Sequence, residues 1–159
     1  MLEEIVKQEL INNNITLNKW TSSSCGWANP EKREIAIPKP VDYDTLGVCF
    51  HEIGHIVLNH IDGQGKPRFV EEYEAEQYAI QKLKEYNRYN IKFELRAISH
   101  VLFKIAQAKN RRMNINKVPQ EIVSWTGLQK RKWKKASKVW VSRRQVNKRK
   151  EILIRFYYY

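Results

Sequence analysis

The most apolar segment of the chain carries two histidines four residues apart. It runs from Thr45 to Ile61 and reads TLGVCFHEIGHIVLNHI, a composition typical of a buried helix. Residues four apart lie on one face of a helix, so the imidazoles of His51 and His55 can bind one metal ion together. The alternative is an accidental pair of core histidines. It would leave the carboxylate of Glu52 among apolar residues without a partner.

The run His-Glu-Ile-Gly-His is the pattern of zinc hydrolases. Two histidines and one carboxylate leave one position of a tetrahedral zinc site open for water and a substrate carbonyl. Glu52 is therefore the candidate catalytic base.

We expect Asp44 or Thr45 to cap the helix and Gly63 to follow its end. Gly54 would admit a strand or a ligand near the metal, or pack against a strand.

The third metal ligand must come from outside this motif. Ile61 stands ten residues after the first histidine, so the extended three-histidine pattern is absent. His60 would lie about 140° around the helix from His55, and we expect it to face away from the metal and to interact with the last carbonyls of the helix.

The downstream segment VEEYEAEQYA is the better donor. Glu72 could complete the coordination, with Glu74 as the alternative ligand. Glu76 could accept the outer N–H of a ligating histidine and fix its tautomer. The competing explanation is that these acids form the solvated face of a surface helix.

The pair HEIGH and EYEAEQYA resembles the motifs of the ImmA/IrrE family of metallopeptidases. Matched residue by residue, the resemblance implies that His51, His55 and Glu72 bind Zn²⁺ and that Glu52 is the base. It covers about residues 20–85. Tyr78 replaces the usual phenylalanine, and the small apolar run ending in proline that often follows is missing. Family members are implied to cleave regulatory proteins such as repressors, often in mobile elements.

The predicted fold is α+β. A mostly helical, zincin-like core with a small β-sheet would occupy residues 1–115, and a basic helical extension would occupy residues 116–159. The expected elements are a helix from Leu2 ending at Asn12-Asn13-Asn14, strands at 15–20 and 33–37, and helices near 45–61, 70–83 and 92–112. We expect the strand around Ile35–Pro38 to offer an exposed edge to an extended substrate.

Charge divides the chain. Residues 1–90 hold 10 basic and 14 acidic residues, whereas residues 91–159 hold 19 and 3. The N-terminus lacks the features of a signal peptide, and the chain has no apolar stretch long enough for a membrane helix. We therefore expect a cytoplasmic protein without membrane contact. Two cysteines, Cys25 and Cys49, are too few for a disulfide framework.

The C-terminal part carries a weaker signal. The segment PQEIVSWTGLQKRKW suggests a helix-turn-helix with Gly127 in its turn. Its basic residues could bind nucleic acid or an acidic protein partner, or could simply form a solvated face over a small aromatic core. The candidates for nucleic-acid binding are Lys130, Arg131, Lys132, Lys134, Lys135, Arg143 and Arg144.

Together these patterns favour a zinc-dependent endopeptidase that cleaves an intracellular protein. Tyr73, Tyr78 and His100 are candidates to stabilise the developing oxyanion. The alternative is a nucleic-acid-binding regulator whose zinc site is structural or vestigial. A third possibility is a metal-free interaction protein.

Overall fold

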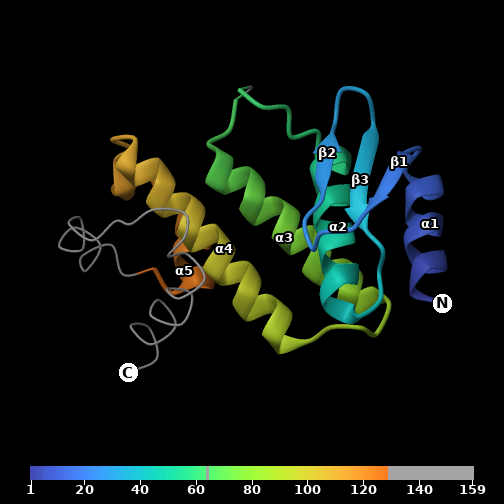
Figure 1. The fold of residues 1–159 in the computed structure, drawn as a ribbon. Helices are drawn as coiled ribbons and strands as arrows, with labels where there is room; N and C mark the ends of the chain where they lie inside the picture. The colour runs from blue at the N-terminus through green and yellow to red at the C-terminus, as the bar shows by residue number, and fades with distance from the viewer. Residues whose placement is uncertain (64, 129–159) are drawn as a thin grey trace. The chain divides into compact units, whose positions relative to one another are not determined.

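A computed structural model describes residues 1–63 and 65–128 (Figure 1). Contacts divide the chain into two compact units, Met1–Ala97 and Ile98–Tyr159. The described residues form five α-helices and a three-stranded sheet, which confirms the α+β class. This division falls inside a helix, after Ala97, whereas the predicted domain boundary lies between residues 115 and 116. The predicted boundary stays a prediction.

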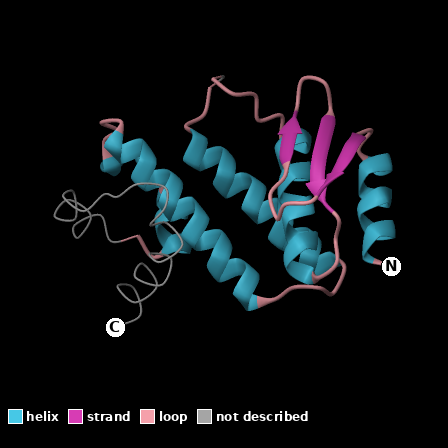
Figure 2. Ribbon diagram, in the orientation of Figure 1, coloured by secondary structure: helices cyan, strands magenta, loops and turns pink. Residues whose placement is uncertain are grey.

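Most of the elements belong to the first unit. Figure 2 shows the helices and strands of the described residues. In chain order they are α1 (Leu2–Asn12), β1 (Thr16–Thr21), β2 (Trp27–Asn29), β3 (Glu34–Pro38), α2 (Tyr43–Val57) and α3 (Arg68–Glu85). Helix α4 (Ile91–Asn110) begins in the first unit and continues into the second. There it is followed by the 3₁₀ turn Ile115–Lys117 and by α5 (Gln120–Thr126).

Strand β3 is the centre of the sheet. It pairs in parallel with β1 and antiparallel with β2. The expectation of a free edge is therefore wrong for Ile35 and Ala36, because β1 pairs with one side of this strand and β2 pairs with Glu34–Ala36 on the other. The strand that covers it, β2, is only three residues long and follows a loop of serines, and the sequence pattern did not reveal it. The edges of the sheet are β1 and β2.

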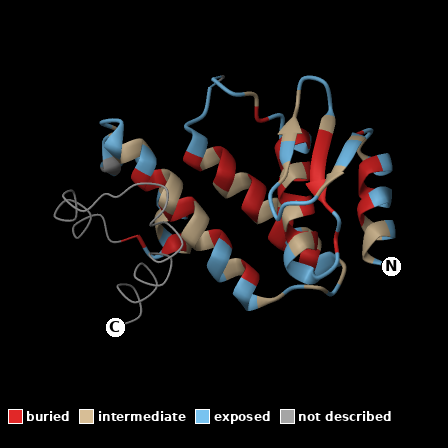
Figure 3. Ribbon diagram, viewed as in Figure 1, coloured by how far each residue is buried: buried red, intermediate tan, exposed pale blue. Residues whose placement is uncertain are grey.

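Helix α2 packs against the sheet on one side and against α3 on the other. Its apolar residues Leu46, Phe50 and Ile53 are fully buried, as are Ile35 and Ile37 of β3. Figure 3 shows the buried residues gathered along α2, α3 and β3. The nearly all-round apolar character of α2 is thus explained by contacts on two of its sides.

The ends of α2 differ from the predicted ones. Asp42, not Asp44 or Thr45, caps the helix by accepting a 2.7 Å hydrogen bond from the backbone N–H of Thr45. The helix ends at Val57 rather than at Ile61, and Asn59 adopts a left-handed φ of +55°. Asparagine tolerates this conformation better than most residues. The chain therefore turns before Gly63, which does not cap the helix.

The second unit is described as far as Leu128. Gly127 follows α5 directly and has a φ of +66°, the left-handed conformation predicted for it. The second helix of the predicted helix-turn-helix and the basic residues 130–144 proposed for nucleic-acid binding lie outside the described residues. In the part of the chain that the structure describes, every helix is too short or too polar to span a lipid bilayer.

Candidate metal centre

Helix α2 presents His51 and His55 on its buried face toward α3. Both side chains are nearly inaccessible to solvent. Their Nε2 atoms lie 3.1 Å apart, as the spacing of four residues predicts. The two rings stand edge to face at an interplanar angle of 85°. Two imidazole nitrogens therefore converge on one point.

Glu72 of α3 contributes a carboxylate oxygen to the same point. Its Oε2 lies 3.3 Å from Nε2 of His51 and 3.7 Å from Nε2 of His55, and its side chain is buried. These three residues form a group that could hold a metal ion. Glu74, the alternative ligand, is not part of this group.

The spacing of the three donor atoms suits a tetrahedral ion. Zinc binds histidine nitrogen and carboxylate oxygen at about 2.0–2.2 Å, so a regular tetrahedron places its donors about 3.3–3.6 Å apart. The observed separations of 3.1, 3.3 and 3.7 Å scatter closely around that range. The donors thus fit a zinc-sized ion with little rearrangement.

A second carboxylate of α3 lies behind His51. Oε1 of Glu76 is 3.4 Å from Nδ1 of His51, on the far side of the ring from Nε2. Burial lowers the pKa of His51, but the hydrogen bonds to Glu72 and Glu76 outweigh it and raise the pKa to about 10. Glu76 thus lies where the sequence places an acceptor for the outer N–H of a ligand.

His55 has the opposite electrostatic balance. Burial and the neighbouring charge of His51 outweigh the attraction of Glu72, and they lower the pKa of His55 to about 4. The lowered pKa favours the neutral form of His55, which is the form of imidazole that binds metals. The raised pKa of His51 favours its charged form, so an ion binding there must displace a proton.

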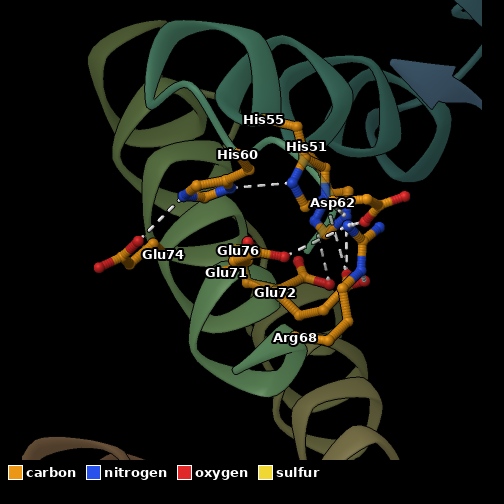
Figure 4. A network of polar contacts seen from close by, with 9 residues as sticks. All are labelled: His51, His55, His60, Asp62, Arg68, Glu71, Glu72, Glu74 and Glu76. Atoms are coloured by element: carbon orange, nitrogen blue, oxygen red, sulfur yellow. Dashed lines mark hydrogen bonds and ion pairs between the residues drawn. The ribbon is translucent and has the colours of Figure 1, made fainter. Parts of the chain in front are cut away.

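His60 does not face away from this group, contrary to the prediction. Because α2 ends at Val57, the helical angle on which the prediction rested does not apply. The chain turns back, and Nδ1 of His60 lies 2.9 Å from Nδ1 of His55 (Figure 4). On the other side of the ring, Nε2 of His60 is 2.9 Å from Oε2 of Glu74.

Glu74 also accepts hydrogen bonds from Nζ of Lys66 at 2.7 and 2.8 Å. Burial acts to raise the pKa of Glu74, but the hydrogen bonds from Lys66 and His60 outweigh it and hold the pKa below its usual value. Glu74 is therefore ionised and paired with residues outside the donor group.

Glu52 leaves α2 next to His51, and its side chain is half-buried. The loop before β2 passes close to it. A Cβ atom added to Gly26 would lie 2.7 Å from Cγ of Glu52 and 3.0 Å from the carbonyl oxygen of Ala36. Gly26 thus provides the space that the side chain of Glu52 occupies.

The candidates for stabilising an oxyanion are in different settings. Burial and the nearby charge of Glu9 of α1 raise the pKa of Tyr78 to about 12. The ring of Tyr78 packs on Gly54, where an added Cβ would meet it at 3.1–3.2 Å. Gly54 therefore serves helix packing against α3 rather than access of a strand to the metal. Tyr73 is half-buried on α3, and His100 is half-buried on α4 in the second unit.

Comparison of the chain with protein-family models, with curated proteins and with solved structures finds no match. The resemblance to the ImmA/IrrE family therefore rests on the motif residues alone. The geometry of the donor group stands independently of it.

Proposed function

We propose that the protein is a zinc-dependent endopeptidase with a zincin-like core. The observation that carries this proposal is the buried triangle of His51, His55 and Glu72 donor atoms beside the half-buried Glu52. The same three donors would also suit Fe(II), which binds two histidines and one carboxylate in many oxygenases. A carboxylate directly following the first histidine favours zinc hydrolysis, because it supplies a base.

The proposed reaction adds water across a peptide bond. Zinc in such a site supplies Lewis acidity that polarises a carbonyl group and a water molecule. Glu52 accepts a proton from the water as the oxygen bonds to the carbonyl carbon. Glu52 then returns that proton to the amine nitrogen as the C–N bond breaks, which leaves a carboxylic acid and an amine.

Residues that contact the candidate ligands from outside the metal site support the proposed zinc binding. Oε1 of Glu76 lies 3.4 Å from Nδ1 of His51. In the proposed metal-bound state it would accept the Nδ1–H and keep Nε2 directed toward the ion. Arg68 holds the other oxygen of Glu72 at 2.9 Å. The chain thus restrains ligands from both helices before an ion arrives, which lowers the conformational cost of binding.

The test compares the wild type with Glu52→Gln, and uses Glu85→Gln, at an exposed carboxylate of α3, as the matched control. Proteins purified without chelators are analysed for metal, and the proteomes of cells expressing each variant are compared. We expect about one zinc per chain in all three proteins. Fragments should appear with the wild type and the control only, because losing a general base costs about 10²–10⁴-fold in rate.

Two results would overturn parts of this proposal. Equal fragments from wild type and Glu52→Gln would exclude Glu52 as the base. Wild type that retains no zinc, or that retains iron instead, would exclude the zinc site.

The charge of residues 91–159 supports a second proposal, binding of nucleic acid by the C-terminal part. Lysine and arginine neutralise phosphates, so affinity should fall steeply as salt rises. Titration of duplex DNA at increasing salt tests this. Absence of binding at low salt would eliminate the proposal.

A further inference from the structure

His60 lies immediately behind the candidate ligand His55. The turn after α2 places it there, since its backbone N–H donates to the carbonyl of His55 at 2.9 Å. Its side chain is buried. The backbone and the ring of His60 thus both contact His55.

The hydrogen bonds around His60 assign its protons. A carboxylate only accepts, so Nε2 of His60 must donate to Glu74. In the neutral form of His60 this is its single proton, so Nδ1 of His60 is then an acceptor. Nδ1 of His55 lies 2.9 Å away and must be the donor. The proton of His55 is therefore on Nδ1, and Nε2 carries a lone pair.

That lone pair is directed toward the candidate metal. Nε2 of His55 lies 3.7 Å from Oε2 of Glu72 and 3.1 Å from Nε2 of His51. With the other tautomer, a proton on Nε2 would occupy the position of the ion. The choice between the two tautomers thus decides whether His55 can bind a metal.

We propose that His60 is a positioning residue that fixes the metal-binding tautomer of His55, and that Glu74 and Lys66 fix His60 in turn. Figure 4 shows the ring of His60 between His55 and Glu74. Lys66 contacts both oxygens of Glu74, which holds the carboxylate in place. The inference rests on the proposed function for its metal, but the tautomer of His55 can be measured without one.

Two substitutions separate this role from simple packing. His60→Asn keeps an acceptor where Nδ1 stands, whereas His60→Leu fills the same space without one. We expect His60→Leu to lower zinc affinity about 10–100-fold, the range typical of outer partners of metal ligands. His60→Asn should retain most of the affinity. Competition with a chromophoric chelator measures both.

Glu74→Ala should also weaken zinc binding, because it frees His60 to turn. The matched control is Glu85→Ala, which removes an exposed carboxylate of the same helix that is also paired with a lysine, Lys82, at 3.0 Å. We expect no change in the control. Both variants retain the donor group itself.

The second readout is nitrogen NMR of the histidine rings in the zinc-free full-length protein. The wild type and His60→Asn should show His55 protonated on Nδ1, and His60→Leu should show the Nε2–H form. An unchanged tautomer in His60→Leu, or equal zinc affinity in the leucine and asparagine variants, would overturn the role of His60. Wild type that binds no zinc would overturn the proposed function instead, while the NMR comparison still decides the role of His60.

Discussion

Arg68 and Glu72 lie one helical turn apart on α3, and Nε of Arg68 donates to Oε1 of Glu72 at 2.9 Å. This bond engages one carboxylate oxygen and leaves Oε2 directed toward His51. Arg68 is itself held by Asp62, whose Oδ1 lies 2.8 Å from Nη1. The arginine thus holds the carboxylate of Glu72 in an orientation that directs one oxygen toward the histidines.

The first prediction concerns Glu72 and Glu74. Glu72→Ala removes the anionic member of the donor group and should lower zinc affinity by more than the roughly 10–100-fold typical of outer partners. Glu74→Ala should cost less, because Glu74 acts only through His60. Chelator competition measures both affinities. Equal losses in the two variants would contradict the assignment of Glu72 as the ligand.

The second prediction concerns the space beside Glu52. Gly26→Ala would place a methyl group 2.7 Å from Cγ of Glu52, so the side chain must move. A displacement of about 1 Å in a catalytic group can cost about 10²-fold in rate. We expect peptide hydrolysis to fall by up to this factor while zinc content stays unchanged. Ser24→Ala, on the same exposed loop, is the control. Full activity in Gly26→Ala would show that Glu52 tolerates the shift.

The third prediction concerns the two thiols. Cys49 is fully buried and its Sγ lies 3.3 Å from the carbonyl oxygen of Pro38, whereas Cys25 is exposed. Burial raises the pKa of Cys49 to about 12, and the charge of Glu52 adds to the effect. Because the thiolate is the reactive form, a thiol reagent should modify one cysteine in the native protein up to pH 9 and two after denaturation.

The raised pKa of Cys49 also makes the stability of the fold depend on pH. An unfolded chain loses the Cys49 proton near the ordinary value of 9.0, whereas the folded protein keeps it until about pH 12. The folded state therefore binds more protons in that interval, so the contribution of Cys49 to the free energy of unfolding falls as pH rises above 9. Urea unfolding of wild type and Cys49→Ala at pH 8 and 10 should show a smaller loss in the variant. An equal loss would contradict the shift.

The fourth prediction concerns the connection between α1 and α3. Glu9 is buried and accepts hydrogen bonds from the hydroxyl of Tyr86 at 2.8 Å and from Nζ of Lys82 at 3.2 Å. Glu9→Ala leaves both donors without this partner and should lower the free energy of unfolding by about 1–3 kcal/mol. Urea unfolding measures the change. Glu3→Ala, on the same helix, breaks only ion pairs with the exposed Lys7 and Lys39 and should have a much smaller effect.

Local patterns in the sequence were sufficient for most of the helices. The predicted helices near residues 2–12, 45–61, 70–83 and 92–112 correspond to α1, α2, α3 and α4. The spacing of His51 and His55 also predicts that they share a face, because the helix repeat fixes the relation between residues four apart. These features depend on neighbours within one or two turns.

Contacts between separate elements, which depend on where the chain turns back, could not be predicted from local sequence patterns. The sequence suggested three acids of one helix as possible partners of the histidines, and the packing of α3 on α2 placed Glu72 with them and Glu74 with His60. His60 was misplaced because the helix was expected to continue past Val57. A left-handed residue at Asn59 changed the direction of the chain.

The sequence by itself thus determined two histidines on one helical face, a neighbouring carboxylate and an acidic helix to follow. Only the tertiary structure decided which acid approaches the histidines, which side chain holds His55 and which strands form the sheet edges. Periodicity describes a single element, whereas these contacts depend on the angle and register at which separate elements pack, and those are set by the whole core.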